Sequence, residues 1–439
     1  MHIKIHRGTQ EIGGSCVEVW TDDTRIVIDI GMPLVEPDGT EFNLRKHKKL
    51  SPSELIAKGI LPDIPGFYKK TANDKCPLTN DVPQGLLVSH AHMDHFGLGN
   101  YINPDVPWHM GKATHKLIDI NSSFTPLKTE ISNVIYFQSE HSFNIGDIKV
   151  TPFLMDHSAF DSYAFLLEVN GKTLLYSGDF RRHGRKPQRL DVMLRKLPED
   201  IDCLLMEGTA LGRESKTFPS EFDIEDDMQK AFANNDRLSL VWASGQNIDR
   251  LVTIYKAAVR ANKIMLVDFY TGAALDSLAN LGSKLPTAGK GYKLEIYSWK
   301  YNALERFDTA QAEKLRRFQI GRNDISQNQG KYVMVMRPSC KPYFNKMDNL
   351  KNGLLVYSLW GGYLKRPDSK KFTDWLESKG FTIQQIHTSG HADIPTMQRL
   401  TAGVNPKTII PIHTFHSEQY RKYFGDGVKT VKDREKFKL

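Results

Sequence analysis

The stretch Ser89-His90-Ala91-His92-Met93-Asp94-His95 places four side chains that can bind a metal within six positions. It follows residues 85–88, Gly-Leu-Leu-Val, an apolar run that is typical of a buried strand. The first two histidines are two residues apart, so they point to the same side of an extended chain. The aspartate and the last histidine come where the chain must turn, and their side chains can diverge. Because imidazole and carboxylate groups are common metal ligands, the stretch predicts a site for two adjacent metal ions.

The length of the chain bounds the number of domains, and its charge bears on the kind of partner. A chain of 439 residues is long enough for two or three domains with a sizeable core. Lys and Arg total 59 against 51 Asp and Glu, which gives a net charge of +8. This balance is compatible with a polyanionic partner, and equally with a basic surface whose charges are scattered.

The four cysteines, Cys16, Cys76, Cys203 and Cys340, lie far apart and form no Cys-x-x-Cys pair. This spacing argues against a disulfide framework and against a zinc ribbon, and it favours reduced thiols in a cytoplasm. Residues 1–7 lack the long apolar segment of a signal peptide. No apolar run approaches the roughly 20 residues that span a bilayer. We therefore expect a cytoplasmic protein without a membrane partner.

Further short apolar runs end in His, Asp or Glu, mostly beside a small residue. They are residues 25–31 with Asp29, 150–158 with His157, 173–180 with Asp179, 203–209 with Glu207, 386–391 with His387 and His391, and 408–414 with His413. One such run carries little weight, because polar residues end most strands. Together they predict that several strand ends deliver ligands to one edge of a sheet. In this pattern Asp29 orients a metal ligand, although a strand-end cap is the alternative.

Residues 238–358 have a different character. Apolar runs at 238–243, 264–267, 331–336 and 354–358 alternate with helical patterns at 247–258 and 304–318, which predicts a parallel-sheet α/β module. Ser244 and Asn247 fall at a helix N-terminus, a place that favours phosphate. Simple helix capping is the other interpretation.

The flanking segments carry weaker signals. Residues 2–6 and 16–20 alternate as strands do, and 32–84 are irregular apart from a short helix at 53–59. Near the end we expect helices at 368–380, 395–402 and 417–424. Asp393 is expected as an N-cap with Pro395 at the first helical position. The lysine-rich tail 429–438 is expected to be a solvated end, and His109 and His115 are expected to be surface or core histidines.

With these residues in view, the chain resembles the metallo-β-lactamase superfamily. The match consists of His-x-His-x-Asp-His at 90–95, His157, Ser-Gly-Asp at 177–179, His413 and the early Asp29. It is most similar to the β-CASP nuclease branch, which includes ribonuclease J and the cleavage and polyadenylation endonuclease. Three further motifs of that branch match Met206-Glu207-Gly208-Thr209, Thr388-Ser389-Gly390-His391-Ala392 and His413.

The resemblance implies an αββα sandwich with an inserted α/β domain. The implied boundaries are 1–207 for the first part of the metallo-β-lactamase domain, 208–380 for the β-CASP insertion and 381–439 for the return segment. Ribonuclease J has an additional C-terminal domain that helps it dimerise. This sequence ends at Leu439, which leaves monomer and homodimer both open.

The resemblance also implies the ligand sets. His90, His92 and His157 would hold one metal ion, Asp94, His95 and His413 the second, and Asp179 would bridge them. Nitrogen and oxygen ligands suit two Zn²⁺ ions, and Mn²⁺ is acceptable to the same set. The implied chemistry is attack of an activated hydroxide on a phosphodiester, with Asp94 as a catalytic ligand, His391 as general acid and Glu207 orienting it.

The expected substrate is single-stranded RNA, because in this family a His at the third motif accompanies RNA and a Val accompanies DNA. Phosphate contacts are expected from Ser389, Gly390, Ser244, Asn247, Arg181 and Arg182, with the two arginines equally readable as surface charges. The expected function is a metal-dependent ribonuclease, exonucleolytic, endonucleolytic or both. The alternatives are a DNA nuclease, a small ester or thioester hydrolase on the same metal core, and an inactive RNA-binding scaffold.

Overall fold

The computed structural model describes residues 1–439 except 37, 71–80, 125–127, 214–216 and 298–308. Cys76 and residues 304–308 of the expected helix at 304–318 lie outside the described residues. The chain folds into two compact units. The first unit comprises Met1–Arg182, Lys186–Thr217 and Gly390–Leu439, and the second unit comprises His183–Arg185 and Phe218–Ser389. Apart from His183–Arg185, the second unit runs from Phe218 to Ser389, beside the expected insertion at 208–380.

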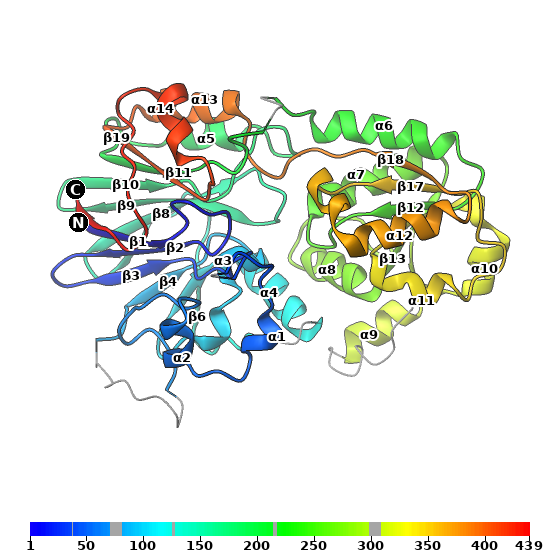
Figure 1. Ribbon diagram of the computed structural model, residues 1–439, viewed down its shortest axis with the longest axis horizontal. Helices are drawn as coiled ribbons and strands as arrows, with labels where there is room; N and C mark the ends of the chain where they lie inside the picture. The colour runs from blue at the N-terminus through cyan, green and yellow to red at the C-terminus, as the bar shows by residue number, and fades with distance from the viewer. Residues whose placement is uncertain (37, 71–80, 125–127, 214–216, 298–308) are drawn as a thin grey trace. The chain divides into compact units, whose positions relative to one another are not determined.

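The first unit is built on two sheets (Figure 1). The seven-stranded sheet has the order β20-β1-β2-β3-β4-β5-β6, and the six-stranded sheet has the order β19-β11-β10-β9-β8-β7. The strands of the first are β1 His2–Arg7, β2 Cys16–Trp20, β3 Arg25–Ile28, β4 Gly85–Leu87, β5 Trp108–Met110, β6 Val134–Tyr136 and β20 Lys436–Lys438. Those of the second are β7 Phe143–Ile145, β8 Ile148–Met155, β9 Ser162–Val169, β10 Lys172–Tyr176, β11 Cys203–Glu207 and β19 Thr408–Ile412.

The two sheets pack face to face around a shared core. On β11, Leu205 points into the layer between the sheets, while Leu204 and Met206 join a second core on the outer face. Both faces of this strand are buried, which explains its continuous apolar sequence. Figure 1 shows helices on the outer face of each sheet, so the unit is an αββα sandwich. On the first sheet they are α1 Leu44–His47, α2 Pro52–Ala57, α3 Met93–Phe96 and α4 Lys112–Phe124, and on the second α5 Arg189–Leu194, α13 Ile394–Val404 and α14 Tyr420–Phe424.

Parts of this unit differ from the expectations. The lysine-rich tail is not only a solvated end, because β20 pairs with β1 and extends the first sheet. The strand is short and alternates Lys with a half-buried Phe437, so lysine content masked its pattern. Asp393 is the N-cap of α13 as expected, but helix α13 begins at Ile394, which puts Pro395 second in the helix.

The second unit is a single seven-stranded sheet with the order β15-β14-β13-β16-β12-β17-β18. Every strand pairing recorded in it is parallel, which confirms the expected α/β module. The strands are β12 Ser239–Trp242, β13 Ile264–Asp268, β14 Leu294–Tyr297, β15 Gln319–Ile320, β16 Tyr332–Met336, β17 Leu354–Tyr357 and β18 Thr382–Gln385. The helices are α6 Glu221–Ala233, α7 Ile248–Arg260, α8 Phe269–Asn280, α9 Thr309–Arg316, α10 Arg322–Gln327, α11 Lys341–Phe344 and α12 Pro367–Glu377.

The run at 386–391 is not a strand of the first unit. The neighbouring strand, β18, ends at Gln385 and belongs to the sheet of the second unit. His387 therefore lies at the end of a strand in the second unit, whereas His391 belongs to the first unit. Within the described part of the chain, no helix has both the length and the apolar character needed to cross a membrane.

Candidate metal centre

The His-rich loop leaves β4 and turns immediately into the short helix α3. His92 is the N-cap of α3, and Asp94 and His95 occupy its first turn. The chain after β3 runs against this turn, where the Ile30 N–H donates to the His95 carbonyl at 2.8 Å. A Cβ atom on Gly31 would lie only 1.7 Å from the Asp94 carbonyl oxygen, so only glycine allows the two segments to approach. The loop is therefore held rigidly by backbone contacts.

The remaining polar groups come from the second sheet and from the return segment. His157 follows β8, Asp179 follows β10, Glu207 ends β11 and His413 follows β19, while His391 precedes α13. The expectation that one edge of one sheet supplies the site is corrected in this respect. Both sheets contribute, because their strand ends meet at the same end of the sandwich.

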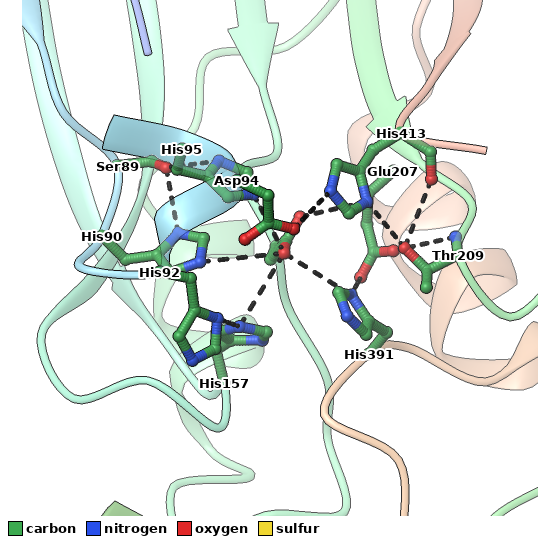
Figure 2. A network of polar contacts seen from close by, with 12 residues as sticks. Ser89, His90, His92, Asp94, His95, His157, Glu207, Thr209, His391 and His413 are labelled. Carbon is green, nitrogen blue, oxygen red and sulfur yellow. Dashed lines mark hydrogen bonds and ion pairs between the residues drawn. The ribbon is translucent and has the colours of Figure 1, made fainter. Parts of the chain in front are cut away.

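The nine residues that meet there form what we call the donor cluster. Its overlapping groups, in each of which the ligand atoms lie within 4.8 Å of one another, are His90–His92–His157, His90–His95–Asp179, Asp94–His95–His413 and Asp179–Glu207–His391–His413. Figure 2 shows His90, His92 and His157 on one side and His413, Glu207 and His391 on the other, with Asp94 between them. The structure thus brings together all the residues expected as metal ligands.

Asp179 is the central carboxylate of the donor cluster. Its Oδ2 atom lies 3.2 Å from His95 Nε2 and 3.8 Å from both His90 Nε2 and His157 Nε2. Its Oδ1 atom lies 3.8 Å from His413 Nδ1. One carboxylate therefore faces imidazoles of both expected ligand sets, which is the position of a bridging ligand.

The buried polar atoms of the donor cluster fit a cation. His90 Nε2, His95 Nε2 and both oxygens of Asp179 are buried without a hydrogen-bond partner among the described residues. Such orphaned atoms cost free energy unless something pairs with them. They converge on one another from several sides, and nitrogen with carboxylate oxygen is the donor set of a divalent transition metal. A divalent metal site therefore satisfies the residues present.

The electrostatics of most of the donor cluster suit this use. His95 and His413 differ, because the carboxylate of Asp179 outweighs the effect of burial and raises the pKa of both imidazoles. Burial lowers the pKa of His90 and His157 well below the ordinary value and that of His92 to about 4, which keeps these imidazoles neutral. Burial also raises the pKa of Asp94 and Asp179, but the adjacent imidazoles outweigh it and hold both pKa values low. Neutral imidazole and ionised carboxylate are the forms that bind metal.

Asp29 lies directly behind the donor cluster and accepts four hydrogen bonds. Its Oδ2 accepts from His95 Nδ1 at 2.7 Å, from the Ser89 hydroxyl at 2.7 Å and from the Tyr176 hydroxyl at 2.8 Å. Its Oδ1 accepts from the Ser89 N–H at 2.7 Å. Since a carboxylate only accepts, the proton of His95 is on Nδ1 and Nε2 is left to face the donor cluster. This geometry favours the orienting role over a simple strand-end cap.

Replacing Asp29 by asparagine is expected to weaken metal binding about 10- to 100-fold, the usual cost of losing a partner behind a ligand. Asparagine tolerates the left-handed backbone of this position, φ 59°, but its amide cannot accept all four hydrogen bonds. Competition with a chelator measures the affinity. The control is Asp161→Asn, because Asp161 is also left-handed at φ 64° but binds the start of α4. Wild-type affinity in Asp29→Asn would contradict the assignment.

Thr209, in the loop that follows β11, orients His413 in a similar way. The Thr209 hydroxyl donates to the His413 carbonyl at 3.2 Å and lies 2.8 Å from Nδ1. The imidazole Nδ1–H then donates to Thr209 Oγ1, which leaves Nε2 facing Asp94 Oδ2 at 3.3 Å. His413 has φ 51°, a strained conformation for a side chain-bearing residue, and such strain clusters at functional sites.

Glu207 and His391 form the pair expected for acid catalysis. His391 Nδ1 lies 3.2 Å from Glu207 Oε1, and Glu207 is buried. Backbone N–H groups from three different segments hold the carboxylate, namely those of Phe180, Thr209 and Ala392. Gly390, just before His391, would place a Cβ atom 2.7 Å from Ser158 Oγ, so glycine is required for this close approach. Glu207 thus positions the imidazole, and the close packing of Gly390 positions the backbone that carries it.

Exposure shows from which side the donor cluster is reached. The side chains of His391 and Asp94 are each 20% exposed, and His92 is also partly exposed. The other members are buried. A substrate would therefore approach past His92, Asp94 and His391.

The residues expected to contact phosphate lie in different surroundings. Asn247 is the N-cap of α7, with Oδ1 accepting from the Arg250 N–H, and Ser244 Oγ accepts from the Gln246 N–H in the turn before the helix. Arg181 is fully buried, with Nε 3.7 Å from Asp156 Oδ1, so the surface position expected as one of its two readings is not found. Arg182 is partly exposed and pairs with Asp191 at 3.1 Å.

Ser389 and Gly390 directly precede His391, a member of the donor cluster, in the sequence. The Ser389 carbonyl accepts from His183 Nε2 at 2.8 Å, which fixes the backbone just before His391. Three orienting residues were not expected as site residues, namely Ser89, Tyr176 and Thr209. Their position beside a ligand or at a strand end was a signal for Ser89 and Thr209, whereas nothing in the sequence distinguishes Tyr176 from a core residue.

Comparison with known proteins agrees with this geometry. The family model described as a beta-lactamase superfamily domain matches residues 62–237, and that described as a Zn-dependent metallo-hydrolase RNA specificity domain matches residues 380–429. These two ranges contain every residue of the donor cluster. Over these ranges the chain is similar to metallo-hydrolases of the metallo-β-lactamase type, which supports a divalent metal at the donor cluster.

Among known proteins the chain is similar to several ribonucleases J. It is 23% identical to the ribonuclease J of Pyrococcus abyssi, over 94% of this chain and 89% of that protein. It is 22% identical to a ribonuclease J of Helicobacter pylori, over 92% of this chain and 55% of that protein. The chain spans between 54% and 60% of the length of the bacterial relatives from Helicobacter pylori and Sinorhizobium meliloti.

A solved structure supports the fold over the whole length. A protein of unknown function from Enterococcus faecalis V583 matches with a TM-score of 0.77 and 20% identity. The match covers 100% of this chain and 99% of that one. The αββα sandwich with an inserted α/β domain is therefore shared by both proteins.

Proposed function

We propose that the protein is a metal-dependent ribonuclease that hydrolyses phosphodiester bonds of single-stranded RNA. The observation that carries the proposal is the central position of Asp179, which faces imidazoles of both ligand sets at 3.2 to 3.8 Å. A carboxylate shared in this way suits two ions close together, the arrangement used for in-line displacement at phosphorus.

In this proposal His90, His92 and His157 hold one divalent ion, Asp94, His95 and His413 hold the other, and Asp179 is common to both. Zinc fits the nitrogen and oxygen donors, and manganese is the second choice. When bound, such a pair lowers the pKa of a water molecule and neutralises phosphate charge. The matched Zn-dependent metallo-hydrolase domain supports the choice of zinc.

Two side chains of the protein act on the substrate and water, and a third positions one of them. Asp94, partly exposed at the opening, orients the attacking water by accepting a hydrogen bond. His391 donates a proton to the leaving oxygen as the phosphorus–oxygen bond breaks, so that one strand end becomes a hydroxyl and the other a phosphate monoester. Glu207 keeps His391 in place through the 3.2 Å contact and does not itself touch the substrate.

Phosphate recognition is assigned to the segment Ser389-Gly390, because it leads directly into His391. The expected contributions of Arg181 and Arg182 are not kept, since Asp156 and Asp191 pair with them. The names of the ribonuclease J relatives, the RNA specificity domain at 380–429 and His413 all support RNA over DNA. The buried free thiols of Cys16, Cys203 and Cys340 support a reducing, cytoplasmic setting.

The proposal predicts metal-dependent loss of RNA. Purified protein with quantified metals is incubated with single-stranded RNA, labelled at either end in separate reactions, and with matched DNA, with and without chelator. RNA cleavage that the chelator stops is the expected result, and the product ladder tells exonuclease from endonuclease. Intact RNA with cleaved DNA would move the assignment to a DNA nuclease. Intact nucleic acid despite bound metal would favour the small-ester hydrolase.

A further inference from the structure

One loop of the second unit carries two exposed aromatic side chains, in addition to the exposed Phe222 of helix α6. Trp360 is 50% exposed and Tyr363 is 36% exposed, and both lie in the loop that follows β17 and contains the short 3-10 helix Gly361–Lys365. The loop is at the carboxyl end of a parallel sheet, the side on which open α/β sheets bind their ligands. Large exposed aromatic groups at such a place indicate a binding surface.

Trp360 is held in position before any ligand arrives. Its carbonyl accepts hydrogen bonds from the Tyr357 hydroxyl at 3.1 Å and from the Tyr363 N–H at 3.0 Å. Its indole lies against Gly362, where an added Cβ atom would come within 2.4 Å of the ring. The rings of Trp360 and Tyr363 meet edge to face, 5.3 Å apart at 88°. The backbone thus supports the indole, and half of its surface faces solvent.

The surroundings of these rings are basic. The Arg366 guanidinium lies over the Tyr363 ring, 4.5 Å from its centroid. Residues 359–371 carry four cationic side chains, those of Lys365, Arg366, Lys370 and Lys371, against the single acid Asp368. Lysine is depleted in the core of protein–protein interfaces, whereas aromatic rings among basic groups are typical of single-strand nucleic acid binding. The chemistry therefore favours RNA over a protein partner.

The aromatic loop is also tied to the segment that leads to Ser389. The Ser358 hydroxyl donates to the Ile386 carbonyl at 2.7 Å, and Gly361 packs on the Gln385 side chain. The buried Arg250 donates to both Ser358 Oγ and, at 3.4 Å, the Thr388 carbonyl. Within the second unit, the loop of Trp360 and the segment approaching Ser389 are therefore neighbours held by one guanidinium.

We propose that Trp360 and Tyr363 form a stacking platform for nucleobases of a single-stranded RNA substrate. The inference rests on the proposed ribonuclease function, which it deepens by naming a second contact with the RNA. Stacking on an aromatic ring is available to every base, so the platform binds RNA without reading its sequence. Lys365 and Arg366 supply charge for the adjacent phosphates.

The test measures binding without cleavage. Metals are removed with chelator, and fluorescence anisotropy follows the binding of a labelled 20-nucleotide polyuridine RNA with a 5′-monophosphate. Trp360→Ala is expected to weaken binding about tenfold, within the range for loss of one stacked base, and Trp360→Phe is expected to retain most of it. Tyr363→Ala, tested separately, is expected to weaken binding as well. Leu281→Ala, which removes a 49% exposed apolar side chain elsewhere in the second unit, is the matched control.

The outcomes separate this inference from the proposed function. Unchanged affinity of Trp360→Ala and Tyr363→Ala would overturn the platform, whether or not the wild-type protein cleaves RNA. Unchanged RNA affinity together with an altered oligomeric state would assign the rings to a protein interface and overturn the inference likewise. Conversely, weaker binding in these variants supports the platform even if the wild-type protein with metal leaves RNA intact, a result that would instead remove the ribonuclease proposal.

Discussion

Replacement of His391 by alanine is expected to slow RNA cleavage by about 10²- to 10⁴-fold, the range for loss of a general acid. The imidazole lies at the opening of the donor cluster, 3.2 Å from Glu207 and 3.6 Å from Asp179. It is not among the residues proposed to hold metal. The bound metal content of the variant is therefore expected to equal that of the wild type.

The leaving group provides a sharper test of this role. A nitrophenyl phosphodiester releases a stable anion that needs no proton, so the loss in His391→Ala is expected to shrink with this substrate. His416→Ala is the matched control, because His416 follows His413 by three residues but pairs with Glu418 on the surface. Loss of metal from His391→Ala, or an equal loss of rate with both substrates, would contradict the assignment of His391 as the general acid.

Replacement of Asp179 by alanine is expected to have the largest effect. The change removes the carboxylate that faces both ligand sets. It leaves five imidazoles facing a methyl group that cannot bind a metal ion. Metal ions contribute several kcal/mol of transition-state stabilisation, and each 1.36 kcal/mol is tenfold in rate. Cleavage should therefore fall by about 10³-fold or more, together with a loss of bound metal.

Metal analysis after dialysis and a cleavage assay measure the two effects. The matched control is Asp202→Asn, because Asp202 lies just before β11, at the end of that strand opposite Glu207, and binds Thr173 and Lys407. This variant is expected to keep its metal and its rate. Full metal content in Asp179→Ala would show that the carboxylate is not a shared ligand.

The sequence predicted most of the donor cluster because ligand-type residues interrupt apolar runs. His157, Asp179 and His413 each follow a strand that is buried on both faces, so the polar residue marks the point where burial ends. The parallel sheet of the second unit was predictable for the same reason, since its strands are continuous apolar segments between amphipathic helices.

What the sequence did not reveal depends on partners distant in the chain. Arg181 reads equally as a phosphate contact or a surface charge, but it is completely buried beside Asp156. Tyr176 reads as a core residue, but its hydroxyl reaches Asp29, 147 positions earlier. Strands β6 and β20 are short and lie at the edges of their sheet, where exposed side chains weaken the alternation that identifies a strand.

The way Glu207 is held has a consequence for protein synthesis. Its carboxylate accepts from the backbone of Ala392, and the acid next to it, His391, also comes from the last fifty residues, as does His413. A chain still emerging from the ribosome carries the His-rich loop long before it carries these groups. Under the proposed function, the nascent protein therefore lacks its acid and its last metal ligand, and the site is complete only after the return segment has folded.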